Sequence, residues 1–327
     1  MNLSDQGISA PLPFTSERTR RRFLAESTLL AVGAAWLAGP RKVFADEYPD
    51  TRTMPHVPGR FRLRQRRSRW GREKSKPYEP EFEEVEWEAS RTAIIVCDMW
   101  AEHPCRMAAQ RVDMMAPRMN EVLTKARDHG AAIIHAPSSG VHHYEGTPWR
   151  KRMQEARPAK PPVPIQGRWE CQLDRETELP VEARQRVEGA ASGCDDPQPA
   201  PMPDADRHQH PAIKIIGYDG ISHSGGEIYN FLAQEGIRNV VLMGVHTNMC
   251  VLGRPFGIRQ QVLLGYNVAL ARDLTDALYD PRDPPHVSHA RGTELIIQHI
   301  EKYWCPSILG RDLTEVVPGS NHAGQGT

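Results

Sequence analysis

Several features are scarce in this sequence, and each absence removes a class of protein. Acidic and basic side chains balance at 41 each, so no net charge favours nucleic acid or an anionic membrane as a partner. Six cysteines in 327 residues are too few for a disulfide scaffold. No apolar run approaches the ~20 residues of a membrane-spanning helix. What is left is an ordinary globular chain, long enough for one large α/β core or two modest ones.

Residues 1–45 have the features of an export signal. Thr19-Arg20-Arg21-Arg22-Phe23-Leu24 fits the twin-arginine pattern Ser/Thr-Arg-Arg-x-Phe-Leu. An apolar run from Leu29 to Ala38 and the small-residue site Val43-Phe44-Ala45 follow, and the run is too short to span a bilayer. We therefore predict a twin-arginine signal peptide and export to the periplasm or another extracytoplasmic space. A retained amphipathic helix or an uncleaved anchor is the alternative.

Residues 46–90 are interpreted as an N-terminal arm. They show no clear periodicity, and a basic stretch from Arg60 to Arg72 precedes an acidic one from Glu79 to Glu88. The basic stretch alone would suggest an arm that binds nucleic acid. Because the acidic stretch neutralises its field, we expect instead a solvated arm that lies on the domain or on a neighbouring subunit.

From residue 91 onward, strand and helix patterns alternate. Short apolar runs typical of buried strands occupy residues 92–97, 131–135, 212–216, 239–244 and 267–271, and helical stretches occupy residues 112–128, 225–234 and 288–300, with another entered around Cys250. Such alternation indicates a parallel sheet covered by helices on both faces. We predict one three-layer α/β/α domain over residues 91–315, with a central, mostly parallel sheet of about six strands. A disordered tail is expected at residues 316–327.

Residues 136–210 interrupt this alternation. The segment is rich in proline and has few periodic stretches, and a structureless loop of that length is unusual inside a compact domain. We interpret it as an insertion or lid. Trp149 and Trp169 are its expected docking points and candidates for lining a substrate pocket.

Three reactive side chains fall at or near the carboxyl ends of predicted strands, where ligands bind in open parallel sheets. They are Asp98 after the first strand, Lys214 in the third and Cys250 just past the fourth. Taken alone, each has an ordinary explanation: a helix cap, a lysine that snorkels to solvent and a small buried hydrophobe. Together they supply the parts of a catalytic apparatus.

The chemistry of the three groups is complementary. A nearby ammonium lowers the pKa of a thiol and so favours the nucleophilic thiolate. A carboxylate takes the thiol proton and later delivers it to a leaving amine. The dipole of a helix that starts at Cys250 would assist, and backbone N–H groups of that turn would form an oxyanion hole. The set predicts acyl transfer to water through a covalent intermediate on Cys250.

Three stretches around these residues carry a further signal. They are Gly244-Val245-His246-Thr247-Asn248-Met249-Cys250-Val251, Ile94-Ile95-Val96-Cys97-Asp98-Met99, and Ile213-Lys214 followed by Ser222 to Glu227. They resemble the nucleophile loop, the first strand and the lysine strand of the isochorismatase-like cysteine hydrolase superfamily. The resemblance implies a triad of Asp98 as general acid/base, Lys214 as activating cation and Cys250 as nucleophile. It also implies a cis peptide between Val245 and His246, with the N–H groups of His246 and Cys250 as oxyanion donors.

Departures from the family pattern narrow the expected chemistry. Nicotinamidase-like members have Asp-x-Gln near the first strand, whereas Trp100 stands at the Gln position here and is a candidate pocket residue. Their Asp-x-His metal cluster is replaced by His135-Ala136-Pro137-Ser138. The nearby His142 and His143 are adjacent in sequence and are interpreted as solvent-facing. We therefore expect no metal and no cofactor.

The resemblance implies hydrolysis of an amide, ureido or related C–N bond of a small molecule, because members that act on a vinyl ether do not need the cysteine. Two alternatives stay open: a nicotinamidase with a degenerate metal site, and a catalytically silent exported binding protein on the same fold. The resemblance also implies a homo-oligomer, in which the arm at residues 46–90 would be a contact. No nucleic-acid partner is expected, and no membrane partner after export.

The other cysteines carry weaker signals. Cys97 is expected to point away from Asp98 into the core. Cys171 and Cys194 lie in the insertion and could form a disulfide after export, although sequence alone does not give their distance. Gly193-Cys194-Asp195-Asp196 is interpreted as a polar turn rather than a metal site.

Three further residues have no assigned function. Cys105 and Cys305 match no motif. Pro255 follows Cys250 by five residues, and we expect it to kink the helix there or to make a new helix start after it.

Overall fold

The computed structural model describes residues 59–73, 75–167, 176–201, 207–318 and 320. The predicted signal peptide lies outside these residues, as do Trp169 and Cys171. No helix in the described part of the chain is long and apolar enough to cross a membrane.

One sheet organises the described residues. Its strands are β1 (Arg60–Ser68), β2 (Pro80–Glu88), β3 (Thr92–Cys97), β4 (Ala132–Ala136), β5 (Gly220–Ile221), β6 (Asn239–Val245), β7 (Asn267–Asp276) and β8 (Ser307–Ile308). Their spatial order is β2-β1-β8-β7-β6-β3-β4-β5. Neighbours from β8 to β5 pair in parallel, whereas β1 pairs antiparallel with both β2 and β8. The predicted mostly parallel α/β sheet is confirmed, and the described residues give it eight strands.

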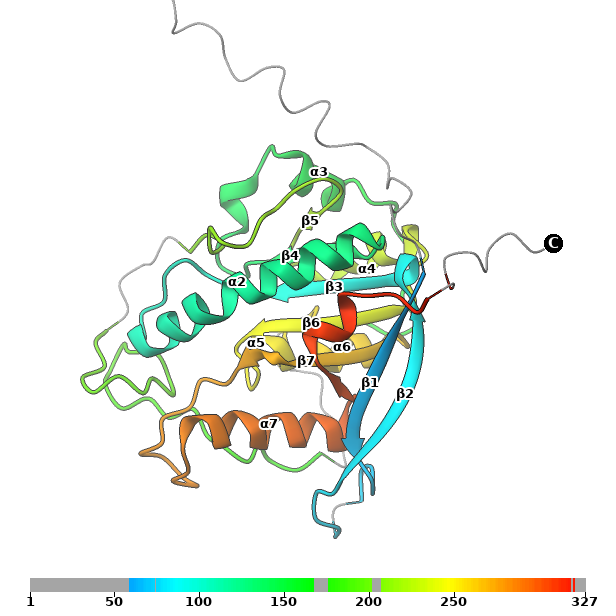
Figure 1. The fold of residues 1–327 in the computed structure, drawn as a ribbon. Coiled ribbons are helices and arrows are strands. Elements are labelled where there is room, and N and C mark those ends of the chain that lie inside the picture. The colour runs from blue at the N-terminus through cyan, green and yellow to red at the C-terminus, as the bar shows by residue number, and fades with distance from the viewer. Residues whose placement is uncertain (1–58, 74, 168–175, 202–206, 319, 321–327) are drawn as a thin grey trace, which may run out of the picture. The chain divides into compact units, whose positions relative to one another are not determined.

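Helices cover both faces of this sheet (Figure 1). They are α2 (Arg106–Asp128), α3 (Pro148–Gln154), α4 (Gly225–Gln234), α5 (Cys250–Gly253), α6 (Ile258–Leu263) and α7 (His289–Tyr303), with the short 3-10 helices η1 (Ala89–Arg91), η2 (Val141–Tyr144) and η3 (Gly310–Leu313). The buried side chains of α2 pack on one face, and those of α4, α5, α6 and α7 pack on the other.

The side-chain alternation of the central strands explains the three layers. In β3, Ile94 and Val96 belong to the buried cluster on the α2 side. Ile95 and Cys97 belong to the cluster beneath α4 to α7. Because both faces are covered, all six residues of β3 are buried, and the strand reads as a continuous apolar run.

The residues expected to form a solvated arm form a hairpin instead. β1 pairs with β2 along its whole length and joins the sheet through Arg66 opposite Ser307 of β8. Phe61 and Leu63 are fully buried and alternate with arginines, the two-residue period of a half-buried strand. The basic β1 lies opposite the acidic β2, so cross-strand pairs neutralise the charge of both. The arm prediction is therefore wrong for residues 60–88, which are part of the domain.

Two other sequence predictions fail. Residues 212–216 form no strand, and the edge strand β5 comes later and has only two residues. The tail expected to be disordered is ordered where it is described, because Val316 forms a bridge with Phe61 and the Val317 N–H donates to the Arg60 carbonyl at 2.8 Å. These contacts place the apolar Val316 against the cluster that contains Phe61.

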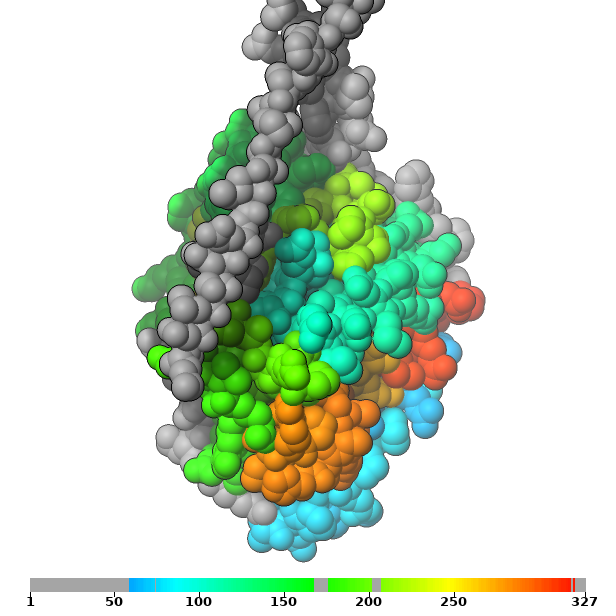
Figure 2. Space-filling model, turned by 90° about the vertical axis from the view of Figure 1, so that its left-hand side faces the viewer, coloured from blue at the N-terminus to red at the C-terminus, as the bar shows by residue number. Residues whose placement is uncertain are grey.

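The insertion at residues 136–210 has little regular structure where it is described, with η2 and α3 near its start. Near its end, Gln209 forms a bridge with Trp100. Figure 2 shows the residues around 180–200, in green, beside the start of α2 in teal and the segment near residues 280–288 in orange. The insertion therefore lies over the ends of the strands rather than apart from the domain.

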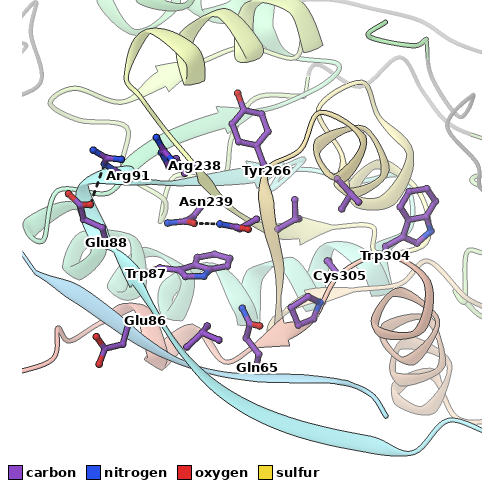
Figure 3. Close-up of a pocket in the computed structure, with 15 residues that line it drawn as sticks. Gln65, Glu86, Trp87, Glu88, Arg91, Arg238, Asn239, Tyr266, Trp304 and Cys305 are labelled. Carbon is purple, nitrogen blue, oxygen red and sulfur yellow. Dashed lines mark hydrogen bonds and ion pairs between the residues drawn. The ribbon is translucent and has the colours of Figure 1, made fainter. Parts of the chain in front are cut away.

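The two ends of the parallel strands form different surfaces. We call the surface at their carboxyl ends, which faces the viewer in Figure 2, the carboxyl edge. We call the surface at their amino ends the amino edge. A hollow at the amino edge is lined by residues that include Gln65, Trp87, Asn239, Tyr266 and Cys305 (Figure 3).

Candidate active site

Asp98 and Cys250 come together because the strands before them approach closely. β3 ends at Cys97, which lies opposite Gly244 of β6. Gly244 has a φ of +102°, and a Cβ there would lie 2.0 Å from the carbonyl oxygen of Cys97. Glycine alone tolerates both that backbone and that approach. The loops that follow the two strands therefore meet at the carboxyl edge.

Asp98 is held rigidly. It is fully buried and has a φ of 48°, a left-handed conformation that non-glycine residues adopt rarely and mostly where function requires it. The backbone N–H of Ser138 donates to Oδ1 of Asp98 at 2.6 Å, and the Ser138 hydroxyl lies 2.7 Å from both carboxyl oxygens. These contacts fix the direction in which Asp98 presents its carboxyl group.

Cys250 is the first residue of α5 and is 5% exposed. Nε of Arg254 donates to its Sγ at 3.4 Å. A hydrogen bond from the Cys97 thiol, the positive charge of Arg254 and contact with Asp98 lower the pKa of Cys250 to about 5, although burial acts in the opposite direction. Cys250 is therefore a thiolate at neutral pH, the form that acts as a nucleophile.

The helix dipole expected to assist Cys250 is small, because α5 has only four residues and a macrodipole is a sum over aligned peptide units. The guanidinium of Arg254 and the Cys97 thiol act in its place. Cys97 is buried in the core as predicted, and its thiol also contacts Cys250.

Arg254 connects the thiolate to the carboxyl group. Its Nη2 donates to Ser138 Oγ at 2.8 Å, and that hydroxyl contacts Asp98. A residue before proline is driven to an extended backbone, and Arg254, which precedes Pro255, has φ −73° and ψ 161°. Its N–H still donates to the Cys250 carbonyl at 3.2 Å. Pro255 thus ends α5 and sets the backbone from which Arg254 reaches back to Cys250.

The proton of the Asp98 and Cys250 pair resides on Asp98. Burial and the negative charge of Cys250 raise the pKa of Asp98 well above its usual range, and the hydrogen bonds from Ser138 offset this only in part. The site therefore combines a carboxylic acid, a thiolate and a guanidinium. A proton donor lies beside a nucleophile, as acyl transfer to an amine-leaving substrate requires.

Lys214 does not join this site. The side-chain ammonium of Lys214 is exposed and donates to the carbonyl of Pro211 at 3.1 Å. The backbone N–H of Lys214 donates to Asn120 Oδ1 at 2.9 Å. The predicted third strand does not form, so no backbone carries Lys214 to the carboxyl edge. The cation that contacts the Cys250 sulfur is Arg254 instead. The sequence did contain a signal for this contact: Arg254 lies one helical turn after Cys250 and directly before Pro255.

An aromatic wall lies beside the nucleophile loop. The Trp100 ring stacks on His103 at 5.4 Å between centroids, and His103 meets His246 edge-on at 5.1 Å. The guanidinium carbon of Arg207, from the insertion, lies 5.1 Å above the Trp100 ring. Burial and the charge of Arg207 lower the pKa of His103 to about 4, and burial lowers that of His246. Both rings are neutral at pH 7, and the Val245–His246 peptide bond that precedes the loop is cis.

The remaining predicted residues lie further out. Trp149 is half-buried on α3, and His142 and His143 are exposed. His135, at the position of the family's metal cluster, contacts Asp219 at 3.0 Å and Gln209 at 2.5 Å through its two ring nitrogens. Its ring is therefore engaged within the protein.

The hollow at the amino edge has a different character, although pockets are a usual guide to active sites. Its polar groups bond one another: Asn267 Nδ2 donates to Asn239 Oδ1 at 2.9 Å, and Arg91 and Glu88 form an exposed ion pair at 3.3 Å (Figure 3). The reactive groups lie at the opposite ends of the same strands. The reactive side chains at the carboxyl edge, and not the hollow at the amino edge, therefore identify the candidate site.

Comparisons with known proteins identify one family and several similar solved structures. The isochorismatase domain family matches residues 92–291, more than half of the 327-residue chain. A cysteine hydrolase from Pseudomonas syringae pv. phaseolicola 1448A is similar in structure, with 16% identity, 73% of this chain and 96% of that chain covered, and a TM-score of 0.41. An isochorismatase from Pseudomonas putida KT2440 has 11% identity, 71% and 92% coverage and a TM-score of 0.39. A search of curated proteins returns no match.

Proposed function

We propose that this chain, which belongs to the isochorismatase family, is a cysteine-dependent hydrolase that cleaves an amide or ureido C–N bond of a small molecule. The observation that carries the proposal is the Cys250 thiolate, held between the guanidinium of Arg254 and the protonated carboxyl group of Asp98. An inert buried cysteine has a raised pKa, so the lowered value indicates a thiol built for reaction.

In the first half-reaction, the Cys250 thiolate attacks the carbonyl carbon of the substrate and forms a tetrahedral intermediate. The backbone N–H groups of His246 and Cys250 are the proposed donors to its oxyanion. The protonated Asp98 then donates its proton to the leaving nitrogen, the C–N bond breaks, and a thioester on Cys250 remains.

In the second half-reaction, the ionised Asp98 takes a proton from water, and the resulting hydroxide attacks the thioester carbon. The acid leaves, Cys250 returns to the thiolate, and Asp98 is again protonated. Arg254 stabilises the Cys250 thiolate before it attacks and again as it leaves the thioester, and Ser138 holds the carboxyl group in place between the two proton transfers.

Rapid alkylation at pH 6 tests the thiolate directly. Wild type should take up one iodoacetamide quickly, as measured by intact mass, and Cys250→Ala should take up none at that rate. Arg254→Gln should react about 10²-fold more slowly, because its thiol pKa rises towards the ordinary ~8.5. Lys214→Met is the matched control and should react like wild type, because its ammonium lies in a solvent-exposed loop.

Equal slow labelling of wild type and Arg254→Gln would contradict the proposal and would favour a silent binding protein on this fold. If Lys214→Met slows labelling as much as Arg254→Gln, the assignment of the activating cation is wrong. If the labelling results are as expected, small amides and ureides are screened as substrates. Nicotinamide is included, because its hydrolysis would favour the alternative of a nicotinamidase with a degenerate metal site.

We further propose that the chain is exported by the twin-arginine route. The support is the motif around Arg20 and Arg21 and the short apolar run after it. A variant with both arginines changed to lysine should stay in the cytoplasm on cell fractionation, whereas Arg41→Lys, outside the motif, should be exported. Export of the double variant would contradict the proposal.

Self-association through the hairpin is also proposed. Trp70 and Phe82 lie in or beside this hairpin and are 37% and 46% exposed, although large exposed apolar groups usually mark contacts only when they cluster. Sedimentation of wild type should give a homo-oligomer, and Phe82→Glu should shift it towards the monomer. A wild-type monomer at micromolar concentration would overturn this assignment.

A further inference from the structure

A second group of reactive side chains lies where the insertion meets the start of α2. Sγ of Cys105, Sγ of Cys194 and a carboxylate oxygen of Asp196 all lie within 4.8 Å of one another. The three residues are 0%, 4% and 2% exposed. They share no residue with the Cys250 site.

We propose that Cys105, Cys194 and Asp196 bind one zinc ion. Two thiolates and one carboxylate are a donor set that zinc takes in tetrahedral geometry, whereas magnesium and calcium prefer oxygen ligands alone. Binding releases the two thiol protons to solvent, one from each cysteine, as the two sulfur–metal bonds form. Water is the proposed fourth ligand, or else Asp195 Oδ1, which lies 3.5 Å from Cys105 Sγ and accepts from Arg111 Nη2 at 3.0 Å.

Backbone groups at the start of α2 hold the carboxylate of Asp196. The backbone N–H groups of Arg106 and Met107, in the first turn of α2, donate to its two oxygens at 3.0 and 2.9 Å. Such contacts fix the direction of a metal-binding carboxylate. Two thiolates, one carboxylate and Zn²⁺ carry one net negative charge, and the amino end of the 23-residue α2 favours a negative group beside it.

The position suggests what the ion would do. Around the two cysteines, Leu278 and the partly buried Met249 complete a small apolar cluster, and Met249 directly precedes Cys250. The carbonyl of Asp196 accepts from Arg282 at 2.8 Å. An ion here would tie the returning insertion to α2 and to the nucleophile loop. The stretch Gly193-Cys194-Asp195-Asp196, interpreted from sequence as a polar turn, would then be a ligand turn.

The arrangement of Cys105, Cys194 and Asp196 has two alternative explanations, and the experiment below distinguishes both from a zinc site. In one, the Cys105 thiol donates to the Asp196 oxygen 3.6 Å away and no ion binds. In the other, the two sulfurs form a disulfide, which would need them to move to the ~2.05 Å bond length. The geometry favours the ion, because a buried carboxylate oxygen lies within 4.8 Å of both sulfurs and a disulfide would make no use of it.

The test is metal content of the full chain, purified under reducing conditions and loaded with zinc before gel filtration. Inductively coupled plasma mass spectrometry should find about one zinc ion per wild-type chain, the stoichiometry of a single structural site. Cys194→Ser should lose at least about 90% of it, given the loss of one of three protein ligands. Cys305→Ser, which changes a buried cysteine elsewhere, is the matched control and should keep it.

Cobalt provides a second readout that does not depend on folding yield. Cobalt-loaded wild type and Cys305→Ser should show a thiolate-to-metal charge-transfer band, and Asp196→Asn should show it with weaker binding, since both thiolates remain. Absence of zinc and of the band in reduced wild type would overturn the proposal. A Cys105–Cys194 disulfide in unreduced protein, together with no metal uptake after reduction, would overturn it in favour of a cross-link.

Discussion

Cys250 at the carboxyl edge and Cys305 at the amino edge are both buried, 5% exposed each, yet their thiols are tuned in opposite directions. Contacts with Cys97 and Arg254 lower the pKa of Cys250 to about 5. Burial and the negative charge of Glu301 raise the pKa of Cys305. Glu301, which raises that pKa, is itself paired with the guanidinium of Arg66 at 2.8 Å.

The difference teaches that burial alone does not set the reactivity of a cysteine. Removal from water favours the neutral thiol at both places. What separates them is a hydrogen bond from the Cys97 thiol and a positive charge that faces the sulfur directly. The carboxyl edge has that charge because Pro255 ends α5 one turn after the nucleophile. The same two edges also differ in their backbone, since Asp98 has a left-handed φ of 48° beside Cys250.

The largest expected effect comes from removing the proton carrier at the carboxyl edge. In Asp98→Asn, acetylation of Cys250 by p-nitrophenyl acetate should continue, because that leaving group needs no proton. Deacylation should slow by about 10²–10⁴-fold, the usual contribution of a general base. Intact mass should therefore show the acetyl-enzyme accumulating. Normal turnover in this variant would remove Asp98 from the mechanism.

A pH profile measures the difference between the two cysteines. The alkylation rate of wild type should fall as the pH drops through about 5, because the thiolate is then protonated, and should be level above that. In Arg254→Gln the half-maximal rate should move up towards pH ~8.5, and Arg254→Lys should lie between, since it keeps the charge but not the fork geometry. Peptide mapping should find Cys305 unlabelled throughout. If wild type and Arg254→Gln gave the same pH profile of alkylation, Arg254 would not be the group that lowers the pKa of Cys250.

Pro255→Ala should give a smaller effect in the same direction. The variant frees the backbone of Arg254 from its extended conformation while leaving the charge in place. We expect alkylation of Cys250 at pH 6 to slow by about 10-fold, the result of positioning lost rather than charge lost. The measurement is the same labelling rate, with circular dichroism as a folding control. An unchanged rate would show that Arg254 holds its place without the proline.

The smallest expected effect is at the amino edge. Cys305→Ala should leave the alkylation rate of Cys250 unchanged and lower the free energy of unfolding by about 1 kcal/mol, the cost of a small cavity in a packed region. The labelling experiment measures the alkylation rate of Cys250, and urea denaturation measures the free energy of unfolding. Slower labelling of Cys250 in this variant would mean that the two edges are coupled.

Much of the fold could be predicted from the chain alone. The continuous apolar run of β3 and the amphipathic pattern of α4 were sufficient because each buries its apolar residues through local periodicity. The hairpin of β1 and β2 was missed, although Phe61 and Leu63 alternate with arginines, because the charge runs concealed the two-residue period. The predicted strand at residues 212–216 was wrong, because four apolar residues around Lys214 do not by themselves find a partner strand.

The candidate site was partly predictable for the same reason. Asp98 and Cys250 follow strands whose pairing is dictated by local pattern, so their meeting could be expected from chain order. Arg254 was overlooked because its position depends on where α5 ends. Ser138 lies at the start of the insertion, where no periodic signal exists, and its contacts with Asp98 require the loops to be folded.

By itself, the sequence determined the mostly parallel sheet, the positions of its central strands along the chain and the two loops that carry Asp98 and Cys250, because apolar periodicity and glycine placement act locally. The tertiary structure decided which cation faces the thiolate, since Lys214 and Arg254 are both basic and only folding brings one of them to the sulfur. It also decided that Cys105 and Cys194, far apart in the chain, share one buried space. Distances between such groups are properties of the packed molecule, and no local pattern encodes them.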